Sequence, residues 1–169
     1  LQEDTALAQA LLDSKKDCYE HDIVVQTMCE RLDALTSEMS IAETRIMQLS
    51  NIQHLYSPIT ASLNKGENVL SVLSKLHPTP ALGGSPREIA LPLIGGYEPV
   101  PRGWYAAPVG WIDANLDGQF VVAIRSAVAQ AKRVWMYAGA GIVADSDPQK
   151  EWDEIALKFR PMLNAHGIE

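Results

Sequence analysis

The chain has 169 residues, of which 47% are hydrophobic and 21% charged, a composition typical of one folded domain with a real core. Its formal net charge of -7 argues against nucleic acid or an anionic membrane as partner, because both attract clustered lysine and arginine. These residues show no signal-peptide pattern and no apolar run long enough to span a bilayer, so we expect neither secretion nor a membrane span. The spacing of Cys18 and Cys29 suits neither a disulfide nor a metal motif, so we expect reduced thiols and a cytoplasmic protein.

The first 57 residues contain neither glycine nor proline. Apolar or small residues recur among them at alternating steps of three and four, which predicts one long amphipathic helix over residues 4–38. Such spacing also permits a coiled coil, but Ser14, Cys18 and His21 are poor residues for a coiled-coil seam. We favour a helix that packs on its own domain.

Beyond residue 44 the period shifts towards strands, short helices and turns. The pattern predicts an α+β fold in which antiparallel strands are covered by the long N-terminal helix and a C-terminal helix. A turn at 115–118 should join two strands of a three-stranded antiparallel meander. The expected elements are strands at 45–49 and 53–63, helices at 67–75 and 86–95, meander strands at 103–113, 119–127 and 134–143, and a closing helix at 148–164.

Two glycines close to the start of the last helix suggest a binding site. Gly139 and Gly141 allow backbone N–H groups to approach an anion, which a helix N-terminus also favours. Glu151, Glu154 and Lys158 follow at helical spacing, so one face carries two carboxylates and an ammonium. These groups could hold a hard cation together with an anion bound to it. Turn glycines and a solvated charged face are the plainer interpretation of this segment taken alone.

Other isolated polar residues lie in apolar surroundings. Arg125 interrupts an apolar strand and offers a planar fork for a carboxylate, although a surface arginine is an equally simple interpretation. Tyr105, expected on the neighbouring strand, could donate a hydroxyl to the same carboxylate. Glu20 lies near the apolar stripe of the first helix and is a possible metal ligand. His54 lies in an expected strand, where a hydrogen-bonded core histidine is the default and acid–base chemistry the alternative.

Four motifs occur in order along the chain: LHPTPALGG at residues 76–84, RGWYAAPVGW at 102–111, AIRSA at 123–127 and AGAGIVADS at 138–146. Together they resemble the chorismate-utilising enzymes, the family of anthranilate, aminodeoxychorismate, isochorismate and salicylate synthases. The resemblance covers essentially the whole chain. It is closest to the isochorismate synthases, particularly those of the menaquinone type. Four motifs in the right order make it far more specific than any one of them.

This resemblance implies a Mg²⁺-dependent site for chorismate. Glu20 and Glu154 resemble the two carboxylates that hold the metal, with Glu151 close by, and the metal would bind the ring carboxylate of chorismate. His54 resembles a family histidine beside the ring hydroxyl that leaves, which is a catalytic position. The implied substrate-binding residues are Gly139, Ala140, Gly141 and Lys158 for the ring carboxylate, and Tyr105 and Arg125 for the enolpyruvyl carboxylate.

Ala81 bears on the type of reaction. Aminating and lyase members of the family typically carry threonine there, whereas isochorismate synthases carry alanine within an HPTPA string, as this chain does. A methyl group instead of a hydroxyl changes what a buried pocket can hydrogen-bond. The resemblance therefore implies attack of water at one ring carbon with loss of hydroxide from another. It requires neither ammonia nor a glutaminase subunit, and it leaves open whether the product enters a menaquinone or a siderophore pathway.

The resemblance also implies that part of the catalytic machinery lies outside this chain. In isochorismate synthases the lysine that activates water and the glutamate that protonates the leaving hydroxyl lie upstream of the matched region, and this chain begins at Leu1. We expect residues 1–169 to be the C-terminal portion of a chorismate-binding domain, inactive without the missing N-terminal half. Two alternatives remain: a binding or regulatory module derived from the family, and an interaction protein that dimerises through its first helix.

Overall fold

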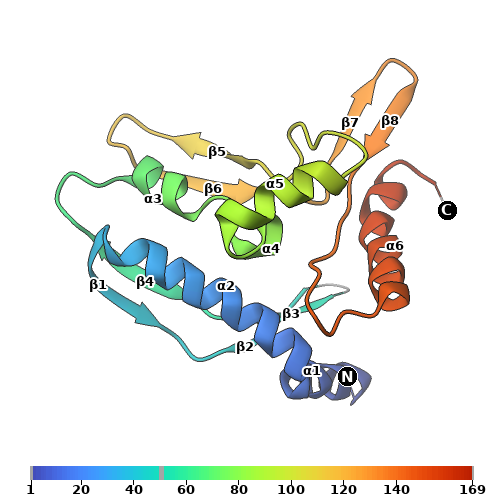
Figure 1. Cartoon of the computed structure of the whole chain (residues 1–169), viewed down its shortest axis with the longest axis horizontal. Coiled ribbons are helices and arrows are strands. Elements are labelled where there is room, and N and C mark those ends of the chain that lie inside the picture. Colours follow the sequence, from blue (N-terminus) through green and yellow to red (C-terminus); the bar gives the residue numbers. More distant parts are fainter. Residues whose placement is uncertain (1, 50–51, 169) are drawn as a thin grey trace.

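The computed structural model describes residues 2–49 and 52–168 and confirms the α+β class (Figure 1). In the described residues, α2 contacts β1, α3 and α4, while α1 contacts β2 and β3. Cys18 and Cys29 are free thiols, as expected. The elements are α1 (Gln2–Asp13), α2 (Lys15–Asp33), β1 (Thr36–Ile41), β2 (Arg45–Gln48), β3 (Gln53–Tyr56), β4 (Ile59–Leu63), α3 (Val69–Leu76), α4 (Pro80–Gly83), α5 (Arg87–Tyr97), β5 (Pro108–Ile112), β6 (Gly118–Val122), β7 (Ala127–Gln130), β8 (Arg133–Met136) and α6 (Pro148–Ala165).

The N-terminal helix is neither continuous nor as long as its apolar period predicted. It is interrupted at Ser14, whose hydroxyl oxygen accepts a hydrogen bond of 3.3 Å from the backbone N–H of Asp17 and so caps α2. α2 ends at Asp33, and β1 occupies most of the remaining stretch that was expected to be helical. This part of the prediction was wrong because β1 forms a ladder with β4, a distant partner that a local period cannot reveal.

The expected strand at 53–63 divides into two strands that belong to different sheets. β3 pairs with β2, and β4 pairs with β1, both antiparallel. The division falls at Ser57 and Pro58, where proline lacks the N–H needed to continue a ladder. A change of partner strand within one extended run therefore has a local cause.

The expected three-stranded meander is also wrong, since the structure has two separate hairpins there. Within the described residues, β5 pairs with β6 alone and β7 with β8 alone, in two-stranded sheets. Residues 103–106 form a turn rather than the first part of a strand, and 137–147 form a loop that leads to α6. The glycine-containing segment is thus a loop between a hairpin and a helix, visible as the long connection before α6 in Figure 1.

The later helices match the expectations closely. The side-chain oxygen of Asn68 caps α3 by accepting hydrogen bonds from two backbone N–H groups, and α5 covers the segment expected at 86–95. α6 begins after Asp147, whose carboxylate accepts a hydrogen bond of 2.9 Å from the backbone N–H of Lys150. Only α4 was not predicted, because four residues are too few to show a helical period.

Few side chains are buried, and the apolar surface is extensive. The buried apolar residues are Leu32, Leu35, Ala106 and Met162, and none of the described large side chains is fully enclosed. Tyr97, Trp104 and Ile142 are 86%, 79% and 74% exposed. The accessible surface is 12265 Å², whereas a compact monomer of this mass would expose about 8,200 Å². None of the described helices combines the length and apolarity that a bilayer crossing requires.

Candidate active site

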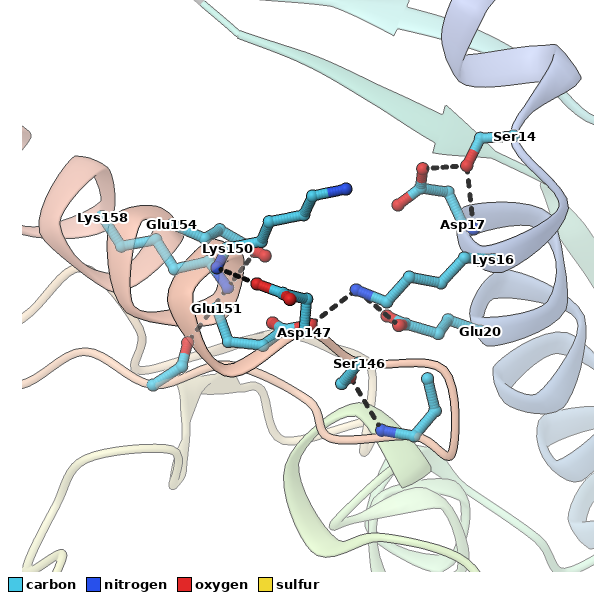
Figure 2. A network of polar contacts seen from close by, with 12 residues as sticks. Ser14, Lys16, Asp17, Glu20, Ser146, Asp147, Lys150, Glu151, Glu154 and Lys158 are labelled. Carbon is cyan, nitrogen blue, oxygen red and sulfur yellow. Dashed lines mark hydrogen bonds and ion pairs between the residues drawn. The ribbon is translucent and has the colours of Figure 1, made fainter.

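The first turns of α2 present charged side chains towards α6 (Figure 2). The serine cap fixes where α2 begins, so Lys16 and Glu20 lie one turn apart on the same face. Their side chains form an ion pair, with Lys16 Nζ 3.4 Å from Glu20 Oε1. Both side chains are about one-third exposed, so this pair lies at the edge of the site rather than in a closed interior.

The start of α6 contributes the most buried charge among the described residues. Glu151 is only 5% exposed, and its Oε1 accepts a hydrogen bond of 2.6 Å from Lys16 Nζ across the gap between the two helices. This bond is the main reason that the pKa of Glu151 lies below its usual value, with a smaller contribution from the hydroxyl of Ser146. The same bond raises the pKa of Lys16. The ion pair thus joins α2 to α6, although 135 residues separate its partners.

One turn further along α6, Glu154 and Lys158 form a second ion pair. Lys158 Nζ also donates a hydrogen bond of 3.0 Å to the backbone carbonyl of Gly139. The lysine therefore ties the loop at residues 137–147, called the glycine loop below, to α6, and its ammonium lies beside that loop. Its expected contact with a bound anion stays a prediction. Glu154 is exposed, in contrast to Glu151.

The glycine loop lies close to the Tyr105 side chain and to the Glu20 carboxylate of α2. The rings of Tyr105 and Tyr137 stack with their centroids 5.5 Å apart. A Cβ atom on Gly139 would lie 3.5 Å from the Tyr105 hydroxyl, and one on Gly141 would lie 4.0 Å from Glu20 Oε2. A side chain at position 139 would therefore fill space beside the Tyr105 hydroxyl, and one at position 141 would fill space beside Glu20. The glycines leave both spaces open.

Tyr105 and Arg125 are brought together by backbone hydrogen bonds, not by two neighbouring strands as expected. The N–H of Ala106 donates to the carbonyl of Ala123, and the N–H of Ala123 donates to the carbonyl of Ala107, at 3.0 and 2.8 Å. These bonds join the turn before β5 to the segment after β6. Arg125 lies outside any strand with a φ of 53°, so its expected place within an apolar strand was wrong.

His54 on β3 lies within the electrostatic reach of this cluster. Burial lowers the pKa of His54, and the positive charges of Arg125 and Lys158 lower it further. Burial raises the pKa of Tyr105, while Arg102 and Arg125 act in the opposite direction. The structure thus gathers His54, Tyr105, Arg125 and Lys158, which come from four distant parts of the chain, around one region.

Ala81 lies on α4 and is exposed. The segment that carries it is held by three arginines that sequence reasoning did not single out. Arg31 donates to the carbonyls of Leu76 and Pro78 at 3.1 and 2.8 Å, Arg87 to that of His77 at 3.2 Å, and Arg102 to that of Leu82 at 2.7 Å. No pattern in the sequence marks these arginines, because their acceptors are backbone carbonyls.

The carboxylates of this region supply oxygen atoms, the type of donor that a divalent cation prefers. Among the described residues, no three His, Cys, Asp or Glu side chains are close enough to form a metal-binding group. Glu20 Oε1 is shielded from solvent and accepts no hydrogen bond, although it lies 3.4 Å from the ammonium of Lys16. Carboxylate oxygens are the ligands that Mg²⁺ prefers, so the donor type fits such a cation. Lys16 was also missed, although its spacing of four residues from Glu20 could have marked it.

Comparison with known proteins identifies the family of the chain. A family model described as chorismate binding enzyme matches residues 1–167. The chain is 41% identical over 169 residues to isochorismate synthase MenF of Bacillus subtilis, covering 99% of this chain and 36% of the relative. It is 44% identical over 165 residues to the salicylate biosynthesis isochorismate synthase of Pseudomonas aeruginosa, covering 97% and 35%.

Solved structures show the same similarity in three dimensions. A putative 2,3-dihydroxybenzoate-specific isochorismate synthase from Bacillus anthracis superposes with a TM-score of 0.93 at 36% identity, over 99% of this chain and 45% of that one. Anthranilate synthase component I from Streptococcus pneumoniae superposes with a TM-score of 0.87 at 28% identity, over 95% and 38%. The chain therefore spans less than half the length of these relatives.

Proposed function

This chain belongs to the family of chorismate binding enzymes, and from that membership we propose that it is part of a Mg²⁺-dependent isochorismate synthase that converts chorismate to isochorismate. The observation that carries the proposal is the convergence of α2, the 137–147 loop and α6. There, Glu20 and Glu151 face each other across Lys16, and Lys158 contacts Gly139. The identities of 41% and 44% to relatives named isochorismate synthase favour this activity over that of the anthranilate synthase structure at 28%.

In this proposal the carboxylates at the helix starts bind the metal. Glu20 and Glu154 are the metal ligands and Glu151 lies close by, as the family resemblance implied. The bound cation would neutralise the ring carboxylate of the substrate. Gly139, Ala140 and Gly141 border the same carboxylate, with Lys158 adding positive charge from α6.

The enolpyruvyl carboxylate is assigned to Arg125 and Tyr105. A guanidinium can bind a carboxylate through two parallel hydrogen bonds, and the Tyr105 hydroxyl adds one donor. The raised pKa of Tyr105 keeps its hydroxyl protonated at neutral pH and therefore able to donate. His54 is assigned to the leaving ring hydroxyl, where a neutral imidazole can donate or accept one hydrogen bond.

The base that activates water and the acid that protonates the leaving hydroxyl are assigned to a part of the protein beyond residues 1–169. The relatives named above have more than twice the length matched by this chain. The excess of exposed apolar surface supports a further segment that packs on it. We propose that this segment, the N-terminal half of the enzyme, is the essential partner, and that no glutaminase subunit is required.

The direct test is product analysis with the full natural polypeptide that contains this chain, supplied with chorismate and Mg²⁺. Chromatography should show isochorismate, and coupling to an isochorismatase should consume it. The same incubation with ammonia should yield no anthranilate or aminodeoxychorismate, because Ala81 stands where the aminating relatives carry threonine. Formation of salicylate or of an aminated product would contradict the proposal and show that the enzyme has another activity of the family.

A further inference from the structure

Tyr137, the residue that follows β8, contacts both segments that carry the residues assigned to the enolpyruvyl carboxylate. Its ring stacks on that of Tyr105, with the centroids 5.5 Å apart and an angle of 17° between the ring planes. Its backbone N–H donates a hydrogen bond of 3.4 Å to the carbonyl of Ser126, the residue after Arg125. One residue therefore links the turn at 103–106 to the segment that follows β6.

The Tyr105 ring belongs to a turn, so neither a helix nor a strand ladder determines its direction. The turn covers residues 103–106, and Gly103 and Ala106 within it have φ values of 56° and 67°. Aromatic rings in an offset stack attract each other beyond the effect of the area they bury. Tyr137 therefore restricts the directions that the Tyr105 side chain can take.

The stack leaves the Tyr105 hydroxyl near the glycine loop and near Arg125. A Cβ atom added to Gly139, two residues after Tyr137, would lie 3.5 Å from that hydroxyl. Burial raises the pKa of Tyr105, and the positive charges of Arg102 and Arg125 oppose this effect. The hydroxyl thus lies close to groups that are assigned to both carboxylates of the substrate.

The same two segments also meet at the carbonyl of Ala123. It accepts a hydrogen bond of 3.0 Å from the backbone N–H of Ala106 and one of 3.1 Å from the hydroxyl of Ser126. This junction aligns the two backbones. The ring of Tyr137, in contrast, acts on a side chain of the site.

We propose that Tyr137 is a positioning residue for substrate binding, which directs the Tyr105 hydroxyl towards the enolpyruvyl carboxylate and keeps it aligned with Arg125. This inference rests on the proposed function, which assigns Tyr105 and Arg125 to that carboxylate. Because Tyr137 acts through its ring, phenylalanine should replace it and an aliphatic side chain should not. Its effect on binding requires the Tyr105 hydroxyl, and this distinguishes it from a residue that only packs.

The test is a double-mutant cycle in the full natural polypeptide, read from initial rates of chorismate consumption. It combines Tyr137→Leu with Tyr105→Phe, which keeps the ring of the stack but removes the hydroxyl. We expect Tyr137→Leu alone to raise KM by about 3- to 10-fold, as the loss of one well-directed hydrogen bond implies, with kcat little changed. In the Tyr105→Phe background the same substitution should change KM by less than about 2-fold, because no hydroxyl remains to be directed.

Tyr137→Phe keeps the stack and should retain the wild-type KM. Tyr97→Leu is the matched control, because Tyr97 lies at the end of α5 and is 86% exposed, and it should leave KM and kcat unchanged. NMR of labelled tyrosine reports the contact without any reaction. The Tyr105 ring signal, assigned by its loss in Tyr105→Phe, should move in Tyr137→Leu and stay in place in Tyr97→Leu. Tyr137→Met, which also lacks a ring, serves if the leucine variant fails to fold.

Equal increases of KM in both backgrounds would overturn the proposal and make Tyr137 a packing residue. Wild-type kinetics in Tyr137→Leu, or a raised KM in Tyr137→Phe, would overturn it as well. Product analysis of the wild type decides the proposed function separately. A product other than isochorismate would refute that activity and leave the cycle readable, whereas a wild type that consumes no chorismate would refute both.

Discussion

At the scale of single residues, Arg125 is the clearest case of a side chain set by an unusual backbone. A φ of 53° is rare for a residue other than glycine and costs on the order of 1–3 kcal/mol. The hydrogen bonds between Ala123 and the Ala106–Ala107 segment lie two residues before Arg125 and help to maintain its backbone conformation. Such strain is commonly retained where a side chain must point in a particular direction, which agrees with the assignment of Arg125 to a carboxylate.

Arg125→Lys should therefore lower kcat/KM for chorismate by roughly 10- to 100-fold in the full natural polypeptide. Lysine keeps the positive charge but loses the planar pair of donors, a loss of about 1–3 kcal/mol. Steady-state kinetics with chorismate as the varied substrate measures the change. Arg133→Lys, on the exposed face of β8, is the control and should retain normal kinetics. Wild-type kinetics for the Arg125 variant would make Arg125 a structural residue.

His54 should titrate below the usual histidine midpoint of about 6.5 in the folded protein. Burial and the charges of Arg125 and Lys158 both disfavour its protonated form. NMR titration of the imidazole measures this midpoint. In Arg125→Gln the midpoint should move upwards, because one of the repelling charges is gone. An unchanged midpoint would show that Arg125 does not influence the titration of His54.

The same shift predicts how stability depends on pH. Because the folded pKa of His54 is lowered, the unfolded chain takes up the proton first as the pH falls below about 6.5. The contribution of His54 is therefore complete above that pH and decreases between it and the lower folded value. His54→Gln should flatten the slope of unfolding free energy in this window, measured by denaturant titration, and an unaltered slope would contradict the prediction.

At the scale of elements, arginine side chains connect the backbone of the 76–84 segment to other parts of the fold. Arg31 reaches from α2 to the carbonyls of Leu76 and Pro78, and its own pKa is lowered by burial and by the nearby charge of Arg87. Two like charges are tolerated there because both guanidiniums donate to backbone carbonyls of the same segment. The position of α4, and with it Ala81, thus depends on α2 and α5.

Arg31→Met should destabilise the protein by about 1–3 kcal/mol, since it leaves two part-buried carbonyls without their charged donor. Hydrogen exchange should accelerate over residues 76–84 more than over α6. Arg160→Met, on the exposed side of α6, is the control and should change stability by less than about 0.5 kcal/mol. Equal effects of the two substitutions would show that Arg31 does not hold the segment.

At the scale of the whole molecule, the accessible surface is larger than a compact monomer of the same mass would expose. The described elements form four two-stranded sheets with open edges, and many large apolar side chains are exposed. Open edges and apolar faces of this kind are normally covered in a stable protein. The loop that carries the glycines itself contains an exposed apolar residue, Ile142.

We therefore expect residues 1–169 alone to self-associate and to lack isochorismate synthase activity. Sedimentation at several concentrations should show association, and the coupled isochorismatase assay should show turnover at background. Loss of a positioned base and acid costs typically 10²–10⁴-fold each, so restoration should require the rest of the enzyme. Robust turnover by the isolated chain would place a base and an acid among its own residues.

The sequence by itself was enough to predict the features that depend on local chemistry or on motif order. The helices expected at 67–75 and 148–164 correspond to α3 and α6, whose observed bounds differ by at most two residues. The family followed from four ordered motifs. The expectation that Glu20, His54, Arg125 and the last helix belong to one site came from the resemblance and stays a prediction. In the structure the charges of Arg125 and Lys158 act on His54, and Lys16 pairs with both Glu20 and Glu151.

Only the tertiary structure decided which groups meet. The end of α2 became β1 because β4 pairs with it, and one predicted strand divided between two sheets because its halves have different partners. The spacing of Lys16 from Glu20 is visible in the sequence, but only the fold places Glu151 beside Lys16. Ladders and ion pairs join residues that are distant along the chain, so a local pattern can name the groups but cannot determine their partners.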